Sequence, residues 1–300
     1  MKKMLISCML MLTSVFASAE IPKKIKVYVS YSGVTPVCMS IVDVYNKIYS
    51  ASAVVVLKPG ASGLIALQDA IQDKDFAIIC GTGVTDALLY KVNVAESSHH
   101  VYQEIKLINI MSFTGMYFIT GNDNPHQTLK SLLNSSTTDK PILVGFEGLG
   151  SKSIANKIIG NTPVTWVQYR QPGEAAASLH LRELDLFVGG YNPLLGLAEA
   201  GKLKMLGHIN VNTDAANKVG PMLNADYPEA VGVANFLGIS SLKNYSQEDL
   251  TEMNKRINNV LATPEVQETF SRANYKIINT LKIENIQSHL LKYNSLLVKK

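Results

Sequence analysis

Hydrophobic and polar positions alternate in two different ways along the chain after its first twenty residues. Apolar side chains at every second position predict a strand over Ile25–Val29, and short β-branched or apolar runs predict strands over 53–57 and 76–80. Apolar side chains three and four positions apart predict helices between these strands. One helix starts at Thr35, its predicted N-cap, and another covers about 63–72.

The same alternation resumes in the second half of the chain. Predicted strands cover 142–146, 164–169, 184–188 and 203–207, and predicted helices cover 148–159, 173–181, 193–200, 246–261, 264 onward and 283–297. Repeated strand–helix alternation is typical of helices that flank a mostly parallel sheet. The sequence therefore predicts the α/β fold class, as two open sheets rather than one long one.

The first 19 residues have the pattern of a secretory signal peptide. A basic start is followed by an apolar run over Met4–Phe16 and by Ala17-Ser18-Ala19, a small-residue cleavage site. An uncleaved anchor and a lipid-modified Cys8 are the alternatives. The apolar run is shorter than the ~20 residues of a membrane span, and almost no apolar stretch precedes Cys8. We therefore expect a mature chain that starts at Glu20 and is periplasmic.

Composition and charge restrict the function classes. The chain has 300 residues, 47% of them hydrophobic and 17% charged, with a net charge of +4. Removal of residues 1–19 leaves 26 basic and 24 acidic side chains, a net charge of +2. So weak a charge argues against a protein that grips nucleic-acid phosphates. The length suggests about two domains, and we expect residues 20–121 plus 233–300 in one lobe and 122–232 in the other.

Two cysteines, Cys38 and Cys80, remain in the mature chain. An oxidising compartment permits a disulfide between them, but we favour the interpretation of two buried, unpaired small side chains. Neither has a Cys or His neighbour at metal-ligand spacing, and the sequence has no carboxylate-rich or His-rich cluster. We therefore predict no metal and no cofactor.

Three loops that follow predicted strands are rich in glycine and hydroxyl groups: Ser30–Thr35, Gly81–Thr85 and Gly148–Ser153. In open α/β sheets, ligands bind beyond the carboxyl ends of the strands. Glycine lets the backbone approach a ligand, and the N-terminus of the following helix offers N–H groups and the positive end of its dipole. Together these features suit an anion. Ordinary strand-to-helix turns use the same residue types and are the alternative.

The sequence carries no catalytic motif that we recognise. Lys152 comes one position late for a phosphate-binding loop after Gly150, and Gly81-Thr82-Gly83 is too short for a dinucleotide fingerprint. No Gly-x-Ser-x-Gly elbow occurs. Asp86 and Asp185, near predicted strand ends, are the only acid–base candidates. We predict no catalytic residue, with an enzyme on the same scaffold as the alternative.

Several short segments follow one another in a recognisable order: Val54–Gly63, Gly148–Ser151, Val167–Arg170, Gly173–Ala176, Glu183–Asp185, Ala200–Lys204, Tyr227-Pro228 and Phe236–Gly238. In order and spacing they resemble the extracytoplasmic receptors of tripartite tricarboxylate transporters, the Bug family, over nearly all of the mature chain.

The first loop departs from the family pattern, which usually reads Gly-Gly-x-x-Asp. Ser32 precedes Gly33 here, and Thr35 stands where the aspartate is expected. In addition, Ser62 replaces a glycine and Gln168 replaces a proline. The change at Thr35 puts the usual ligand contacts of this loop in doubt.

The resemblance implies a type II periplasmic binding protein with two α/β lobes. A small organic acid would bind between the lobes, and membrane transporter subunits would recognise the closed form; a ligand-sensing partner of a signalling protein is an alternative. We expect a monomer and no nucleic-acid partner. The ligand-binding residues that the resemblance and the loops together indicate are Ser30, Tyr31, Ser32, Gly33, Thr35, Thr82, Thr85, Gly148, Gly150, Ser151, Ser153, Tyr169, Arg170, Tyr191 and Asn192.

Overall fold

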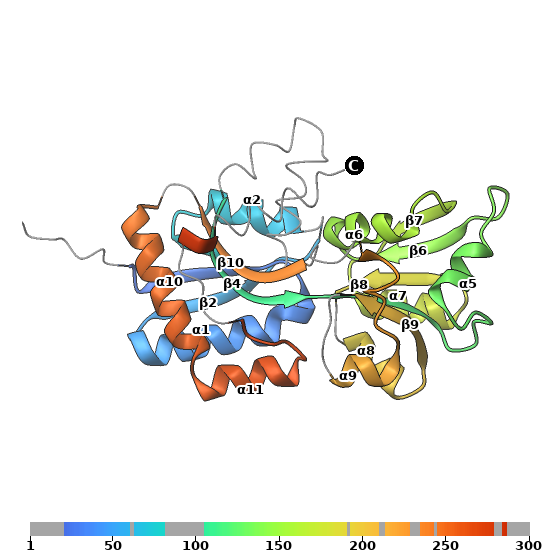
Figure 1. Ribbon diagram of the computed structural model, residues 1–300. Helices are drawn as coiled ribbons and strands as arrows, with labels where there is room; N and C mark the ends of the chain where they lie inside the picture. Colours follow the sequence, from blue (N-terminus) through green and yellow to red (C-terminus); the bar gives the residue numbers. More distant parts are fainter. Residues whose placement is uncertain are drawn as a thin grey trace, which may run out of the picture.

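The computed structural model describes residues 21–60, 63–81, 105–190, 193–209, 214–228, 235–242, 245–278 and 284–286. Within these ranges the strands form two five-stranded sheets, which lie side by side with helices on both faces of each (Figure 1). We call each sheet with its helices a lobe. This is the two-lobe α/β architecture that the sequence predicts.

The first sheet has the strand order β2-β1-β3-β10-β4. Its strands are β1 (Lys24–Val29), β2 (Ser52–Leu57), β3 (Phe76–Gly81), β4 (Ile105–Thr114) and β10 (Asn235–Leu242). Strands β1, β2 and β3 pair in parallel, and β10 pairs antiparallel with both β3 and β4. The pairing of β10 with β4 is irregular, because its register shifts between Leu237 and Gly238 and again between Ile239 and Ser240.

Helices cover both faces of the first sheet because each strand alternates its apolar side chains between them. On one face, apolar residues of α1 (Thr35–Tyr49), α10 (Gln247–Leu261) and α11 (Pro264–Arg272) pack into one core cluster with the sheet. On the other face, α2 (Leu64–Gln72) packs its Ala66, Leu67 and Ala70 against the sheet. Figure 1 shows α2 on the opposite side of the sheet from α1 and α11.

The second sheet has the strand order β7-β6-β8-β5-β9. Its strands are β5 (Met116–Gly121), β6 (Ile142–Phe146), β7 (Val164–Gln168), β8 (Leu186–Gly189) and β9 (Leu203–Ile209). Apolar residues of α5 (Leu129–Asn134) and α6 (Leu149–Ile159) pack on one face. Apolar residues of α7 (Pro172–His180), α8 (Pro193–Glu199) and α9 (Asp214–Val219) pack on the other.

The link between the sheets fixes the direction of the strands. Strand β4 ends at Thr114 and β5 begins at Met116, so Gly115 joins the two sheets. We call this region, with the sheet ends that meet at it, the junction. Because β10 is antiparallel to both β4 and β3, the parallel strands β1, β2 and β3 run toward the junction, as β4 does. Because β5 leaves the junction and is antiparallel to β8, strands β6, β7 and β8 also direct their carboxyl ends toward it.

Each sheet holds one antiparallel strand among those that the structure describes, and both have the same origin. Strand β5 enters the second sheet straight from β4, and β10 enters the first sheet after the elements of the second lobe. A strand that enters from the other lobe must run away from the junction, whereas a strand that follows a helix of its own lobe runs toward it. The two antiparallel strands therefore follow from the two crossings of the chain.

Strand pairing corrects the predicted lobe boundary at 121/122. Met116–Gly121 pairs with β8 and β9 and belongs to the second sheet, so the first crossing lies at Gly115. The turn residues at Asn122–Pro125 instead end β5, where the Asn124 N–H donates to Gly121 O at 3.0 Å. A crossing that continues in one direction needs no turn, and so leaves no turn signal in the sequence.

The predicted N-cap of α1 is wrong by one residue. Val34 is the N-cap, and Thr35 is the first helical residue after a short 3₁₀ turn over Ser32–Val34. The Thr35 hydroxyl donates to Tyr31 O at 3.4 Å instead of accepting from the first helical turn. The helix predicted over 246–261, by contrast, begins as expected at α10, where Ser246 and Asp249 form a reciprocal capping box.

Candidate functional site

The first half of the candidate site lies at the junction end of the first sheet, where β1 passes into α1. Ser30 and Tyr31 are buried, and the Val34 N–H donates to Tyr31 O at 3.3 Å, which closes the turn before the helix. The first-turn N–H groups of a helix have no intrahelical partners. No side chain makes a cap hydrogen bond to the described N-terminus of α1.

Ser30 is the most unusual of the predicted residues. Its side chain is 1% exposed, and its hydroxyl oxygen has no hydrogen-bond partner within the described ranges. It lies against Gly81, whose φ of +146° is a conformation that glycine adopts readily. A Cβ at Gly81 would stand 3.6 Å from Ser30 Oγ and 3.4 Å from Val34 Cγ2. The loop after β1 and the end of β3 are therefore in direct contact.

The second half of the candidate site lies where β6 passes into α6. Gly148 is the N-cap with an extended backbone (φ −129°, ψ 157°), and the Lys152 N–H donates to Gly148 O at 3.2 Å. Gly148, Gly150 and Ser151 are buried, Ser151 with 5% of its surface exposed. Ser153, one position on, is half-buried. The positive end of the α6 dipole thus faces the junction.

Tyr169 and Arg170 follow β7 at the same edge of the second sheet. The Tyr169 N–H donates to Phe146 O at 2.8 Å, which places this residue beside the start of the α6 loop. Its half-buried ring packs edge-on against Phe187, with centroids 6.4 Å apart. The Arg170 side chain is exposed. Arg170 thus follows β7 at the same sheet edge as this loop.

Several predicted residues lie outside the described ranges. These are Thr82, Thr85, Tyr191 and Asn192, together with Asp86 and the signal peptide, and the side chain of Ser32. Of the rest, the structure groups Ser30–Thr35 with Gly81 in the first lobe. It groups Gly148–Ser153 with Tyr169 and Arg170 in the second. Strand direction brings both groups to the junction.

Asp185, one of two acid–base candidates, has a role in holding the second sheet together. It lies at the amino end of β8, on the side away from the junction. Its carboxylate accepts from the Leu143 N–H at 2.8 Å, its own N–H donates to Leu143 O at 3.1 Å, and the Thr120 hydroxyl donates to its carbonyl at 2.7 Å. These contacts give Asp185 a structural function.

Sequence reasoning missed two titratable side chains at the junction end of the second sheet. Tyr117 of β5 and His208 of β9 pair across the strands, with ring centroids 6.3 Å apart. His208 is fully buried, and burial raises the pKa of Tyr117 to about 12. The continuous apolar run Met116–Ile119, which is typical of a strand buried on both faces, is the signal that could have placed Tyr117.

The two cysteines form a disulfide, contrary to the favoured interpretation. Cys38 Sγ and Cys80 Sγ are 2.08 Å apart and the Cα atoms 6.1 Å apart. Cys38 lies in the first turn of α1 and Cys80 next to the end of β3, and both are fully buried. The sequence could not show this pairing because 42 positions separate the two residues and only the packing of α1 on the sheet brings them together.

A groove of about 690 Å³ occurs at the opposite end of the second lobe. Asn122, Asp123, His180 and Lys202 are among its lining residues, and Leu203 begins β9 there. Since β5 ends and β9 begins at this edge, the groove lies away from the junction. Its lining contains none of the predicted ligand-binding residues.

No group of three or more His, Cys, Asp or Glu side chains that could hold a metal ion occurs among the residues described. No helix in these same ranges is long and apolar enough to cross a membrane.

Solved structures share this fold over nearly the whole chain. The periplasmic binding protein BugD superposes with a TM-score of 0.75 at 15% sequence identity, over 93% of this chain and 98% of its own. MatC from Rhodopseudomonas palustris with bound malate has a TM-score of 0.72 at 15% identity, over 92% and 100% of the chains. The R. palustris protein Rpa4515 with adipate has a TM-score of 0.75 at 15% identity, over 92% and 95%.

Sequence comparison adds nothing to this likeness: no protein-family model and no curated protein sequence matches the chain. Structural likeness at 15% identity establishes the fold. The chain therefore has the two-lobe fold of periplasmic solute-binding proteins, in agreement with the fold that the sequence predicts.

Proposed function

We propose that this chain is a periplasmic solute-binding receptor of the Bug type that binds a small carboxylate between its lobes and delivers it to a tripartite tricarboxylate-type transporter. The observation that carries the proposal is the convergence at the junction. There, two helices of 15 and 11 residues, α1 and α6, begin from loops of opposite lobes. Solved proteins of this fold hold malate and adipate, which are small carboxylates.

The chemistry of the two loops suits a carboxylate. Helix N-termini attract anions through their dipoles and first-turn N–H groups. A buried hydroxyl without a partner costs about 1–3 kcal/mol, and a ligand oxygen against the α1 N-terminus would provide the acceptor that Ser30 Oγ lacks. Ser151 and Ser153 would donate from the second lobe, and Arg170 would add a positive charge at the same sheet edge. Because the donors are mostly neutral, a net charge of +2 on the mature chain is compatible with an anionic ligand.

Capture would proceed by closure of the lobes. The chain crosses at Gly115 and again between the second lobe and β10, and such crossings act as hinges in two-lobe binding proteins. We therefore propose lobes that meet at Gly115, with the remaining boundaries as the sequence predicts. The closed form would present one combined surface of both lobes to the transporter subunits.

Export to the periplasm is part of the proposal. A signal-peptide pattern over residues 1–19 supports it. The buried Cys38–Cys80 disulfide supports it independently, because such bonds form and persist in oxidising compartments. Detection of a mature chain that begins at Glu20 in a periplasmic fraction would test this point.

A thermal-shift screen of the mature chain against carboxylates, sugars and cations tests the ligand class. A ligand at 100 times its Kd stabilises the folded state by about 2.7 kcal/mol. We expect a rise in Tm with at least one dicarboxylate, malate and adipate included, and none with sugars. A shift from sugars or cations alone, with silence across all acids, would contradict the proposal.

Two variants place the site. Ser151→Phe puts a bulky ring at the α6 N-terminus and should abolish the Tm shift. Ser178→Phe, at a half-buried position near the end of α7, is the control and should leave the shift in place. An unchanged Tm shift in Ser151→Phe would mean that the ligand does not bind at the α6 loop.

A further inference from the structure

The Cys38–Cys80 disulfide lies directly beneath the first-lobe half of the candidate site. Cys38 is the fourth residue of α1, and Cys80 is followed by Gly81, where β3 ends. Val29 pairs with Cys80 in the sheet, so Ser30 follows β1 beside the disulfide-bearing end of β3. The bond therefore connects the two loops that we assign to ligand binding in this lobe.

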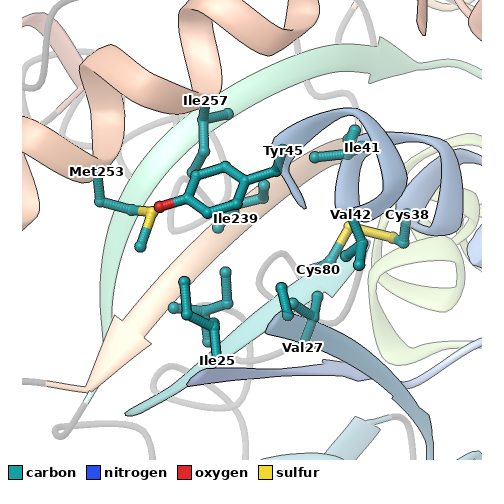
Figure 2. Close-up of a pocket in the computed structure, with 12 residues that line it drawn as sticks. Ile25, Val27, Cys38, Ile41, Val42, Tyr45, Cys80, Ile239, Met253 and Ile257 are labelled. Atoms are coloured by element: carbon teal, nitrogen blue, oxygen red, sulfur yellow. A yellow bond between two sulfur atoms is a disulfide. The ribbon is translucent and has the colours of Figure 1, made fainter. Parts of the chain in front are cut away.

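The packing next to the disulfide leaves free space. A cavity of about 20 Å³ lies between α1, α10 and the sheet, with an almost entirely apolar lining. Figure 2 shows the disulfide at one edge of this cavity and Tyr45, Met253 and Ile257 at the other. Van der Waals contacts are lost where a wall faces empty space. Apolar packing alone thus holds the first turns of α1 less tightly here than a filled core would.

The α1 N-terminus lies close to the end of β3. A Cβ added at Gly81 would stand 3.6 Å from Ser30 Oγ and 3.4 Å from Val34 Cγ2. A slide of the first helical turn by about 1 Å would change the spacing between the helix N–H groups, Ser30 and the end of β3. Ligand sites lose affinity when their groups are not held in the productive arrangement before binding.

We propose that the Cys38–Cys80 bond is a positioning element of the ligand site, which holds the α1 N-terminus and the end of β3 at the spacing that the bound ligand requires. That a ligand binds here rests on the proposed function. That the bond holds the α1 N-terminus against the end of β3 rests on the fold alone. The two cysteines touch the loops and not the ligand, so they act through Ser30–Val34 and Gly81.

The binding experiment compares two variants that both weaken the first-lobe core. Cys38→Ala/Cys80→Ala removes the bond. Met253 of α10 lines the same cavity on the side opposite the disulfide, so Met253→Ala is the matched control for lost stability. Isothermal titration with malate and with adipate is run at a temperature where circular dichroism shows each protein folded.

We expect the double cysteine variant to weaken binding by at least about tenfold, since the site must then be ordered on binding, while Met253→Ala stays within about twofold of wild type. Equal affinities of wild type and the cysteine variant would overturn the inference. Equal losses in both variants would also overturn it, because they would reflect core stability alone. Failure of wild type to bind any acid would contradict the proposed function instead.

A second measurement needs no ligand. Hydrogen exchange is followed in wild type with the disulfide intact and in wild type kept reduced by excess reductant, without alkylation, because both cysteines are fully buried and an added group would itself disturb the core. We expect exchange at the amides of Ser30–Val34 to accelerate by at least about tenfold, while the amides of Ile41–Tyr49 change little. Equal acceleration over both segments would overturn the inference.

Discussion

The two lobes share one plan and differ in how they hold their half of the site. Each has a five-stranded sheet with one antiparallel strand that enters from the other lobe, and each directs a helix N-terminus at the junction. In the first lobe, that helix is tied to the sheet by a disulfide. In the second, α6 rests on apolar packing against one face of its sheet. On the other face, Gly145 of β6 lies in close approach to Tyr169 and Leu184.

One half of the site is therefore held by a covalent bond and the other by the close packing of side chains. A covalent tie does not depend on a filled core, and a cavity of about 20 Å³ lies beside Cys38. Shape-based positioning depends on dense packing, and one added methyl group is enough to disturb it. The two lobes should therefore respond to different kinds of substitution.

The largest effect that we expect is on the first lobe. The disulfide closes a loop with a sequence separation of 42. For a loop of that size, the chain-entropy estimate gives about 4 kcal/mol of stability. Urea unfolding of Cys38→Ala/Cys80→Ala, monitored by circular dichroism, should show a loss of this order. A loss below about 1 kcal/mol would mean that the first lobe is held by packing, as the second is.

The next effect concerns the second lobe. In Gly145→Ala, the new Cβ would stand 2.7 Å from Leu184 Cδ2 and 2.9 Å from Tyr169 Cε2. Overpacking of this kind costs about 1–3 kcal/mol, which urea unfolding would measure. Gly173→Ala is the matched control, since its Cβ would meet nothing within 4 Å in the first turn of α7. Equal behaviour of the two variants would contradict shape-based positioning.

The smallest effect concerns a polar cluster at the opposite end of the first lobe. Asp73 accepts from the Tyr28 hydroxyl at 2.6 Å and from Lys26 Nζ at 3.0 Å. Burial alone would raise the pKa of Asp73, but hydrogen bonds from Tyr28, the Asp75 N–H and Lys26 lower it to about 2. Burial and the bond to Asp73 raise the pKa of Tyr28 to about 12.

The sign of the pH dependence follows from these pKa values. Asp73 titrates at a lower pH in the folded chain than its ordinary 3.8, so its contribution is present above about pH 4 and is lost as the pH falls toward 2. Tyr28 titrates above its ordinary 10, so its contribution is complete below pH 10 and is lost as the pH rises through 12. Asp73→Asn should cost about 1 kcal/mol at pH 7 in urea unfolding, with the difference from wild type shrinking as the pH falls through 2. Asp69→Asn, in an exposed pair with Lys58, is the control and should change little.

Much of the fold follows from short-range patterns. Alternation over Ile25–Val29 and helical spacing after Thr35 placed β1 and α1 correctly, because each element buries one face and so repeats its apolar residues with its own period. The loops at Ser30 and Gly148 were located for the same reason, since they begin where a buried strand ends. The N-cap of α1 was misplaced because the preceding 3₁₀ turn satisfies the same local pattern.

The order of elements and the residues at the carboxyl ends of strands follow from local sequence, since they depend on neighbours within a few positions. Three features depend on long-range packing instead: β5 joins the second sheet at Gly115, Cys38 meets Cys80, and Ser30 Oγ is buried against Gly81. Each of these depends on the register and packing of segments far apart in the chain. Local periodicity carries no record of such contacts, because the same alternating strand can pair with many partners.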